Sequence, residues 1–145
     1  MEVLNAADLQ QRLNGASIRP TLQRMAVASV LLGAPVHMTA EQVLKAARER
    51  LPSLSRATVY AVLQVLVRGG LLKELPIDGA ATVYDSNTQP HHHLYDVDTG
   101  AVADLPMAQL QVLGLPESLG GAQLVDVDVI VRVRGLPRTA PTAQP

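Results

Sequence analysis

Hydrophobic residues recur every three or four positions in four segments of the first half of the chain, the spacing of helices with one buried face. Capping residues, Gly and Pro separate these segments. The pattern therefore predicts four helices, over residues 5–15, 20–33, 39–52 and 55–70. In the last helix, the side expected to face the core is formed by Val59, Val62, Leu63 and Leu66.

Local residues mark where the helices begin. Thr39, with Gln42 three positions later, has the capping-box pattern, in which the two side chains accept hydrogen bonds from each other's backbone N–H groups. Asn5 can accept a hydrogen bond from a free N–H group of the first helix, and Ser55 starts the fourth. Pro20 is expected inside the first turn of the second helix, because its missing N–H would have no helical partner there.

Two apolar runs around Asp78-Gly79 follow the fourth helix and predict a β-hairpin. Two helices joined by a short turn and followed directly by a hairpin are typical of a winged helix-turn-helix. In that motif the second helix enters the major groove of DNA. Arg56, Tyr60 and Gln64 fall on the outer side of that helix, where they either contact DNA or form an ordinary solvated surface.

The second half of the chain has shorter patterns. Residues 91–97 and 101–105 flank an Asp-Thr-Gly turn and predict a second hairpin, and residues 107–115 have the pattern of a short helix. Residues 125–134 alternate Val with charged residues at most positions and predict one half-buried strand. We expect so long a regular strand in so small a domain to pair across a dimer interface.

These elements predict the fold class and the domains. The chain is expected to be α+β, with a winged helix-turn-helix DNA-binding domain over residues 1–86 and a small α/β dimerisation domain over residues 87–135. Residues 136–145 are Pro-rich and are expected to form a disordered tail. The first domain carries 9 Lys+Arg against 7 Asp+Glu and the rest of the chain 3 against 6, a mild asymmetry that alone decides nothing.

Composition narrows the chemistry. The chain is 48% hydrophobic but has no Phe, no Trp and only 3 Tyr, so its core is built from aliphatic residues and we expect oligomerisation to add buried area. It has no cysteine, which excludes disulfides, thiolate zinc sites and cysteine nucleophiles and fits a cytoplasmic protein. Neither a leader segment nor an apolar run long enough to cross a bilayer is visible, so no membrane partner is expected.

Three consecutive histidines begin the second hairpin. Side chains alternate along a strand, so His91 and His93 share one face and His92 points the other way. If the turn is centred on Asp98-Thr99, His93 lies directly opposite Asp104 on the next strand, with their Cβ atoms about 5 Å apart. Two imidazoles and a carboxylate can therefore converge on one point. A one-residue bulge in the turn would break this register.

Such a ligand set suits zinc, iron(II) or manganese(II), and further oxygen ligands favour the harder ions. Asp85, at the end of the wing hairpin, could complete it, and His37, in the loop before the third helix, could tie the DNA-binding domain to it. The ordinary interpretation is that the histidine run and His37 are solvated loop residues and that the carboxylates are exposed surface groups.

Several motifs, taken in order, resemble the ferric uptake regulator (Fur) family over roughly residues 5 to 134. The combination of Ala-Thr-Val-Tyr in the expected recognition helix with the histidine run is specific, whereas either piece alone would be weak. The motifs are Arg19-Pro20-Thr21-Leu22-Gln23-Arg24, Thr39-Ala40-Glu41-Gln42, Ser55-Arg56-Ala57-Thr58-Val59-Tyr60, Tyr84-Asp85-Ser86-Asn87, His91-His92-His93 and Asp98-Thr99-Gly100.

The resemblance implies a homodimeric repressor that binds a double-stranded DNA operator and carries one regulatory divalent metal per subunit between its domains. That metal would be Fe²⁺ or Mn²⁺, with Zn²⁺ able to occupy the site in purified protein. The implied ligands are His37, Asp85, His91, His93 and Asp104. The implied DNA-binding residues are Arg19, Ser55, Arg56, Thr58, Tyr60 and Gln64.

This chain also departs from the family pattern. Many members hold a structural zinc on two Cys-x-x-Cys pairs; here Asp96 and Thr99 stand at the first pair and the second has no counterpart, so we expect no structural zinc on four cysteines and packing in its place. Ala61 replaces an arginine common after the helix tyrosine, so base contacts can differ. A second histidine-rich site found in some members lacks its partners, and His92 is what remains of it.

The chain resembles two branches of the family most. The histidine run and the lack of cysteine are similar to the iron response regulators, which are linked to haem, so His91, His92 and His93 are also candidate haem ligands. Aspartate at position 104 is similar to the peroxide-sensing branch. Two interpretations from other classes remain at this point, a small non-haem metalloenzyme and a metal-independent winged-helix module, but we expect a regulator of iron or peroxide-stress homeostasis and not an enzyme.

Overall fold

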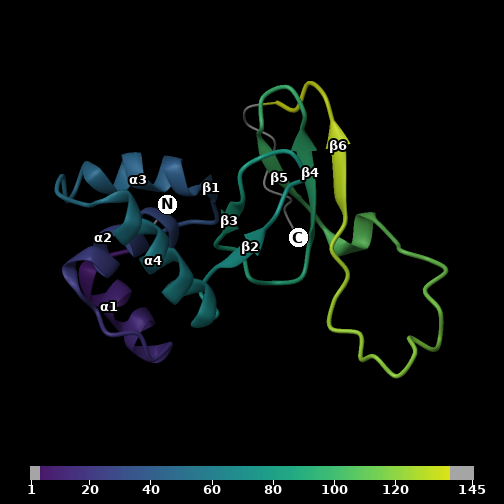
Figure 1. Cartoon of the computed structure of the whole chain (residues 1–145), viewed down its shortest axis with the longest axis horizontal. Helices are drawn as coiled ribbons and strands as arrows, with labels where there is room; N and C mark the ends of the chain where they lie inside the picture. The colour runs from purple at the N-terminus through teal and green to yellow at the C-terminus, as the bar shows by residue number, and fades with distance from the viewer. Residues whose placement is uncertain (1–3, 138–145) are drawn as a thin grey trace. The chain divides into compact units, whose positions relative to one another are not determined.

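The computed structural model describes residues 4–137 and divides into two compact units, one up to Thr88 and one from Gln89 on. The α+β class expected from the sequence is confirmed: helices dominate the first unit and a small sheet forms the second (Figure 1). In the described residues, no helix is long and apolar enough to cross a membrane.

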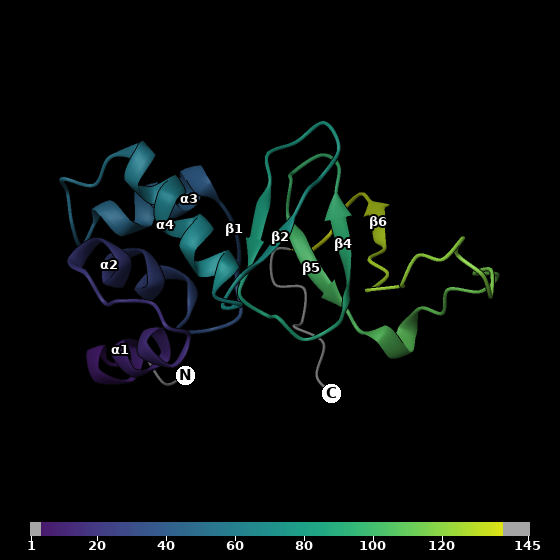
Figure 2. The same ribbon diagram turned by 60° about the horizontal axis from the view of Figure 1, so that its bottom comes forward.

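The first unit is a winged helix-turn-helix, as predicted. Its four helices precede a hairpin, and a short strand lies between the second and third helices (Figures 1 and 2). In chain order, the elements are α1 (Ala6–Gly15), α2 (Leu22–Leu31), β1 (His37–Thr39), α3 (Ala40–Arg48), α4 (Arg56–Arg68), β2 (Lys73–Leu75) and β3 (Val83–Asp85).

The predicted caps form, with one correction. The capping box of α3 is complete, with Thr39 and Gln42 exchanging both hydrogen bonds, and Asn5 caps α1. The expectation for Pro20 was wrong: Thr21 is the cap of α2 and accepts from the backbone N–H of Arg24 at 3.3 Å. The Thr21 hydroxyl can satisfy this N–H, so the helix begins after it and Pro20 precedes the cap.

The core of the first unit is aliphatic apart from Tyr84, as the composition led us to expect. One face of α4 is buried against α2 and α3 through the four residues that its spacing predicted. Helix propensity favours this segment only weakly because it is rich in Val, so burial of this face stabilises the helix. The four residues are Val59, Val62, Leu63 and Leu66, each at most 5% exposed.

The strand β1 was not predicted. It pairs antiparallel with β3, which also pairs with β2, so the three strands form a sheet of order β1-β3-β2. Three residues are too few to show a period-two pattern, and Thr39 also has the features of a helix cap. His37 therefore lies on a strand and not in a loop, and it stands directly opposite Asp85.

The second unit is a three-stranded sheet of order β5-β4-β6. Its elements are β4 (His92–Asp96), β5 (Val102–Leu105), the 3₁₀ helix η1 (Met107–Gln109) and β6 (Ile130–Val133). The predicted hairpin register is confirmed, because His93 is the partner of Asp104 and Tyr95 the partner of Val102. On the other side of β4, β6 runs parallel to it.

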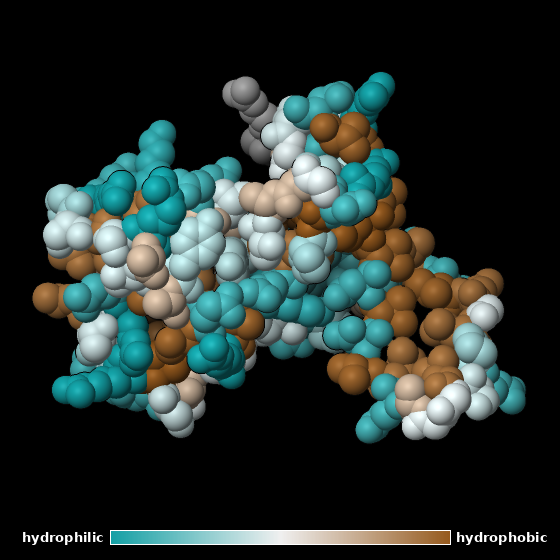
Figure 3. All heavy atoms as spheres, viewed as in Figure 1, coloured by the Kyte–Doolittle hydropathy of each residue, from teal (hydrophilic) through white to brown (hydrophobic). Residues whose placement is uncertain are grey.

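Two elements of the second unit are shorter than the pattern indicated. The expected helix over residues 107–115 is only the turn of η1, and the expected strand over 125–134 is reduced to β6. In the chain as a single copy, the intervening segment exposes large apolar side chains: Leu113 is 82% exposed and Val125 89%. Figure 3 shows this apolar surface over the segment between η1 and β6. Side chains so exposed gain little from packing within the described chain, which leaves both elements without the burial that would extend them.

The predicted disordered tail falls mostly outside the described residues, since 138–145 are not described. Its first residue, Leu136, is ordered: its backbone N–H donates to the Asp96 carboxylate at 2.8 Å.

Candidate metal centre

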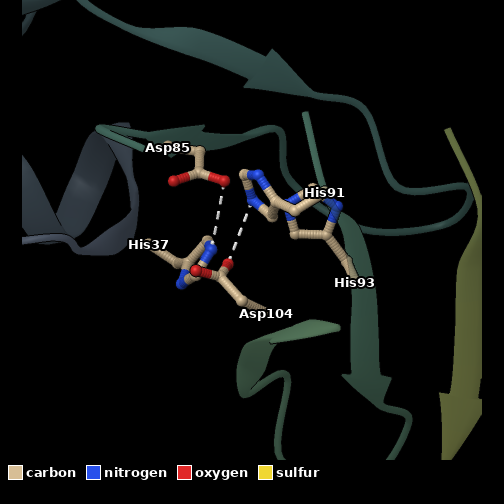
Figure 4. Close-up of side chains that lie close together, drawn as sticks. All are labelled: His37, Asp85, His91, His93 and Asp104. Atoms are coloured by element: carbon tan, nitrogen blue, oxygen red, sulfur yellow. Dashed lines mark ion pairs between the residues drawn. The ribbon is translucent and has the colours of Figure 1, made fainter. Parts of the chain in front are cut away.

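In the first unit, two predicted ligands face each other across the sheet. Strand pairing sets His37 opposite Asp85, and His37 Nε2 lies 3.2 Å from Asp85 Oδ2 (Figure 4). The other carboxylate oxygen of Asp85 accepts from the backbone N–H of Asn87 at 2.9 Å. That bond fixes the carboxylate, which is only 1% exposed, and leaves Oδ2 directed at the imidazole.

In the second unit, the hairpin of β4 and β5 brings the other three predicted ligands close together. The ligand atoms of His91, His93 and Asp104 lie within 4.8 Å of one another, and His91 Nε2 is 3.0 Å from Asp104 Oδ1 (Figure 4). The two imidazole rings are 4.4 Å apart, centroid to centroid, and both are buried. The interpretation of the histidine run as a solvated loop was therefore wrong.

The ring orientation of His91 is also set by its surroundings. Its Nδ1 lies 2.6 Å from the backbone carbonyl oxygen of Gln89. When Nδ1 carries the proton and donates to that carbonyl, Nε2 presents its lone pair on the side of Asp104. Metal-binding histidines are commonly fixed in this way, by a second hydrogen bond that selects the tautomer.

The donor sets of both units fit a divalent first-row metal. Each joins imidazole nitrogen to carboxylate oxygen, the mixture that suits iron(II), manganese(II) or zinc. Two donors bound side by side to one octahedral ion, each about 2.1 Å from it, lie about 3.0 Å apart. The His37–Asp85 and His91–Asp104 donors are at 3.2 and 3.0 Å. A buried carboxylate such as that of Asp85 is normally paired or bound to metal.

His92 takes no part in this cluster. It is 1% exposed, and its Nδ1 accepts from the backbone N–H of Val129 at 3.1 Å, just before β6. The alternation predicted for the run therefore holds, and His92 has a structural contact. This burial argues against His92 as a haem ligand, because a haem iron would need access to the ring.

The outer face of α4 shows where the predicted DNA contacts lie. Tyr60 is 44% exposed, and Arg56 is exposed but engaged by Glu41, with Nε–Oε1 at 2.6 Å and Nη2–Oε2 at 3.1 Å. This pair lowers the pKa of Glu41 and raises that of Arg56. Glu41 was missed in the sequence because it lies 15 residues away, on α3.

Two other predicted DNA contacts have intramolecular bonds. Ser55 caps α4, accepting from the Thr58 backbone N–H while its hydroxyl donates to the Thr58 hydroxyl. Gln64 donates to Glu74 on β2 at 2.7 Å and connects α4 to the wing. Arg19, before α2, is exposed.

Burial also changes the pKa of a tyrosine close to Glu74. Tyr84, on β3, is 4% exposed, and its pKa is raised by burial and by the Glu74 carboxylate.

Comparison with known proteins agrees with the fold. The model of the ferric uptake regulator family matches residues 15–131. The peroxide-responsive repressor PerR of Staphylococcus aureus is 34% identical over 98 residues, which cover 68% of this chain and 66% of that protein. The chain thus spans just under two thirds of the length of this relative.

Solved structures have the same architecture. A ferric uptake regulator from Pseudomonas aeruginosa with manganese aligns with a TM-score of 0.64 at 29% identity, over 87% of this chain and 96% of that one. The Campylobacter jejuni peroxide stress regulator aligns with a TM-score of 0.62 at 24% identity, over 95% and 99%, a likeness of fold alone. These findings define the class of the protein as a winged helix-turn-helix protein with buried His and Asp side chains of the kind that can bind metal. The chain belongs to the ferric uptake regulator family.

Proposed function

We propose that this protein is a metal-responsive DNA-binding transcriptional regulator, a repressor of genes for iron or peroxide-stress homeostasis, acting in the cytoplasm. The observation that carries the proposal is the placement of metal-type ligands in both units: His37 and Asp85 on the winged-helix sheet, and His91, His93 and Asp104 on the second hairpin. The two sets would hold one ion together.

The regulatory ion would be Fe²⁺ or Mn²⁺, with Zn²⁺ able to take its place in purified protein. Two carboxylates beside three imidazoles favour these ions over a soft metal. A structural neighbour of this chain was solved with manganese, which supports the choice. The ion would link the sheet of the winged helix to the second hairpin. Its binding would therefore restrict the orientations that the DNA-binding unit can take relative to the second unit.

The recognition helix would be α4. Thr58 and Tyr60 are the proposed base contacts, and Arg56 and Arg19 the proposed phosphate contacts, which supply affinity without sequence information. Ser55 and Gln64 also lie at the proposed DNA-binding surface. Because Ser55 caps α4 and Gln64 bonds to the wing, their proposed role is to hold α4 and the wing in position.

We also propose a homodimer. The segment between η1 and β6 exposes large apolar side chains, among them Leu113, Leu124 and Val125. A surface of this kind is typical of a site covered by another chain. Two copies would present two recognition helices to two half-sites of an operator.

The rival functions have less support. Of the three candidate haem ligands, His92 is buried and bonded to Val129, while His91 and His93 belong to the metal set. A small metalloenzyme would leave the winged helix without a purpose, and membership of a regulator family argues against it.

The test of a shared ion is a metal titration of the full chain with Mn²⁺, comparing a ligand variant from each unit. We expect one ion per chain, and His37→Ala and His93→Ala should each weaken its binding by about 10- to 100-fold or more. Asp78→Asn, an exposed carboxylate at the wing turn, is the control and should bind as the wild type does. Two ions per chain, each lost in only one variant, would show separate sites and refute the proposal.

A further inference from the structure

Asp96, the last residue of β4, has a side chain held by three backbone hydrogen bonds. It is fully buried. Its Oδ1 accepts from the backbone N–H groups of Asp98 at 2.8 Å and Thr99 at 3.0 Å. Its Oδ2 accepts from the backbone N–H of Leu136 at 2.8 Å. Hydrogen bonds to an ionised acceptor are roughly twice as strong as neutral ones.

These three bonds join parts of the chain that are distant in sequence. Asp98 and Thr99 form the turn between β4 and β5, whereas Leu136 follows β6, 40 residues after Asp96. The backbone N–H of Val97 also donates to the Val133 carbonyl at 3.0 Å, so the main chain adds to the same junction. One carboxylate thus fixes the hairpin turn and the parallel edge strand at the same end of the sheet.

This position has a particular meaning in the family that the chain resembles. Asp96 and Thr99 stand where many members carry the first Cys-x-x-Cys pair of a structural zinc. The residues here do not fit that ion: the sequence contains no cysteine, both Asp96 oxygens accept backbone N–H bonds, and the Thr99 hydroxyl accepts from the Ala101 N–H at 3.2 Å.

We propose that the Asp96 carboxylate replaces the structural zinc as the cross-link of the second unit, a metal-free clasp that fastens β6 to β4 through the Leu136 amide. A structural zinc contributes folding energy by joining chain segments, and here charge-assisted bonds to backbone amides join them. The expectation that packing alone compensates for the missing zinc is therefore incomplete. The same amides, Leu136 foremost, hold the pKa of Asp96 below its usual value, so the side chain stays charged at neutral pH.

The clasp has a consequence for the metal ligands. The backbone N–H of His93 donates to the Val129 carbonyl at 3.0 Å, and His93 pairs with Ile130 of β6. Because β6 pairs with β4, the bond between Asp96 and Leu136 that holds β6 in place also stabilises the strand that carries His93.

Hydrogen exchange of the full chain, kept in excess chelator, tests the clasp. In wild type, the Leu136 amide and the amides of β6 that bond to β4 should stay protected without metal. In Asp96→Asn, the remaining oxygen can still accept from the turn, but the new NH₂ group cannot accept from Leu136. The Leu136 amide should then exchange faster by on the order of tenfold or more, with β6 following. Glu117→Gln, at an exposed carboxylate of the second unit, is the control; Asp98 does not serve, because its carboxylate pairs with Arg134 just after β6 at 3.6 Å.

A second variant covers the case in which Asp96→Asn does not fold. Leu136→Pro removes the N–H donor and leaves the carboxylate in place, and it should also release β6. Three results would overturn the proposal: loss of β6 protection in wild type when the chelator is added, unchanged Leu136 and β6 exchange in folded Asp96→Asn, or unchanged β6 exchange in folded Leu136→Pro. All three outcomes are independent of DNA binding.

Discussion

The ion pair of Arg56 and Glu41 determines how much charge the proposed DNA-binding face presents. The two side chains are 62% and 56% exposed, so substitution at either position should leave folding almost unchanged. The pair is neutral as a unit. Arg56→Ala leaves the negative charge of Glu41 on α3, Glu41→Gln leaves the positive charge of Arg56 at the start of α4, and the double variant is neutral again.

The expected effects follow from counterion release. Each phosphate neutralised by a basic side chain adds about 0.9 to the salt slope of binding. Losing one contact therefore alters affinity about 3.5-fold more at about 50 mM salt than at about 200 mM. Glu41→Gln should bind DNA more tightly and with a steeper slope than wild type. Arg56→Ala should bind more weakly, with a slope lower by about 1. The double variant also lacks the Arg56 contact, so it should keep the lower slope but bind less weakly than Arg56→Ala, because the unpaired Glu41 charge is gone.

Fluorescence anisotropy of a labelled duplex, titrated with each of the four proteins at several salt concentrations, measures both quantities. A second duplex of unrelated sequence is the control, since a phosphate effect should be the same on both. Unchanged affinity and slope in Arg56→Ala would show that this face does not contact DNA. Weaker binding by Glu41→Gln would show instead that Glu41 holds Arg56 in its productive position, and would refute the charge argument.

Three further predictions concern stability. Leu66→Ala, at a fully buried position of α4, should lower the free energy of unfolding by about 2–5 kcal/mol in urea denaturation, through lost burial and a cavity. Thr39→Ala removes the α3 cap and should cost about 0.5–2 kcal/mol by the same measurement; no change would mean that water replaces the cap. The pKa of Asp96 is lowered on folding from 3.8, chiefly by the Leu136 amide. The contribution of the Asp96 charge to the free energy of unfolding is therefore complete above pH 3.8 and is lost as pH falls through the folded-state pKa. Acid unfolding followed by circular dichroism should therefore depend less on pH below about 4 in Asp96→Asn than in wild type.

The helices and hairpins could be predicted because their signals are local. The caps at Asn5 and Thr39 and the spacing of the buried face of α4 each depend on residues within a few positions. The hairpin register followed from a turn with no bulge, and it brought His93 opposite Asp104. The convergence of His91, His93 and Asp104 could thus be predicted from strand alternation together with the hairpin register.

What the sequence did not show depends on distant segments. β1 exists because β3 offers it a partner more than 40 residues further along the chain, and Glu41 meets Arg56 only once α3 and α4 have packed. The clasp of Asp96 joins residues 40 positions apart. In the single chain only Ile130–Val133 of the strand expected over residues 125–134 forms, because alternation shows that a strand can form but not that a partner is present to hold it. The expected pairing of this strand across a dimer interface stays a prediction.

The central claim is that one metal ion on His37, Asp85, His91, His93 and Asp104 controls DNA binding. Allosteric coupling is reciprocal, so the factor by which metal changes DNA affinity must equal the factor by which DNA changes metal affinity. The claim therefore requires two linked measurements on the same protein.

The most direct test is the dissociation constant of an operator duplex, selected from a random pool, measured by anisotropy with and without Mn²⁺ for wild type and His37→Ala. We predict a change of roughly 5- to 150-fold in wild type, the same factor in Mn²⁺ affinity when DNA is present, and its loss in His37→Ala. A wild-type dissociation constant indifferent to metal, or a His37→Ala variant that responds as wild type does, would contradict the account.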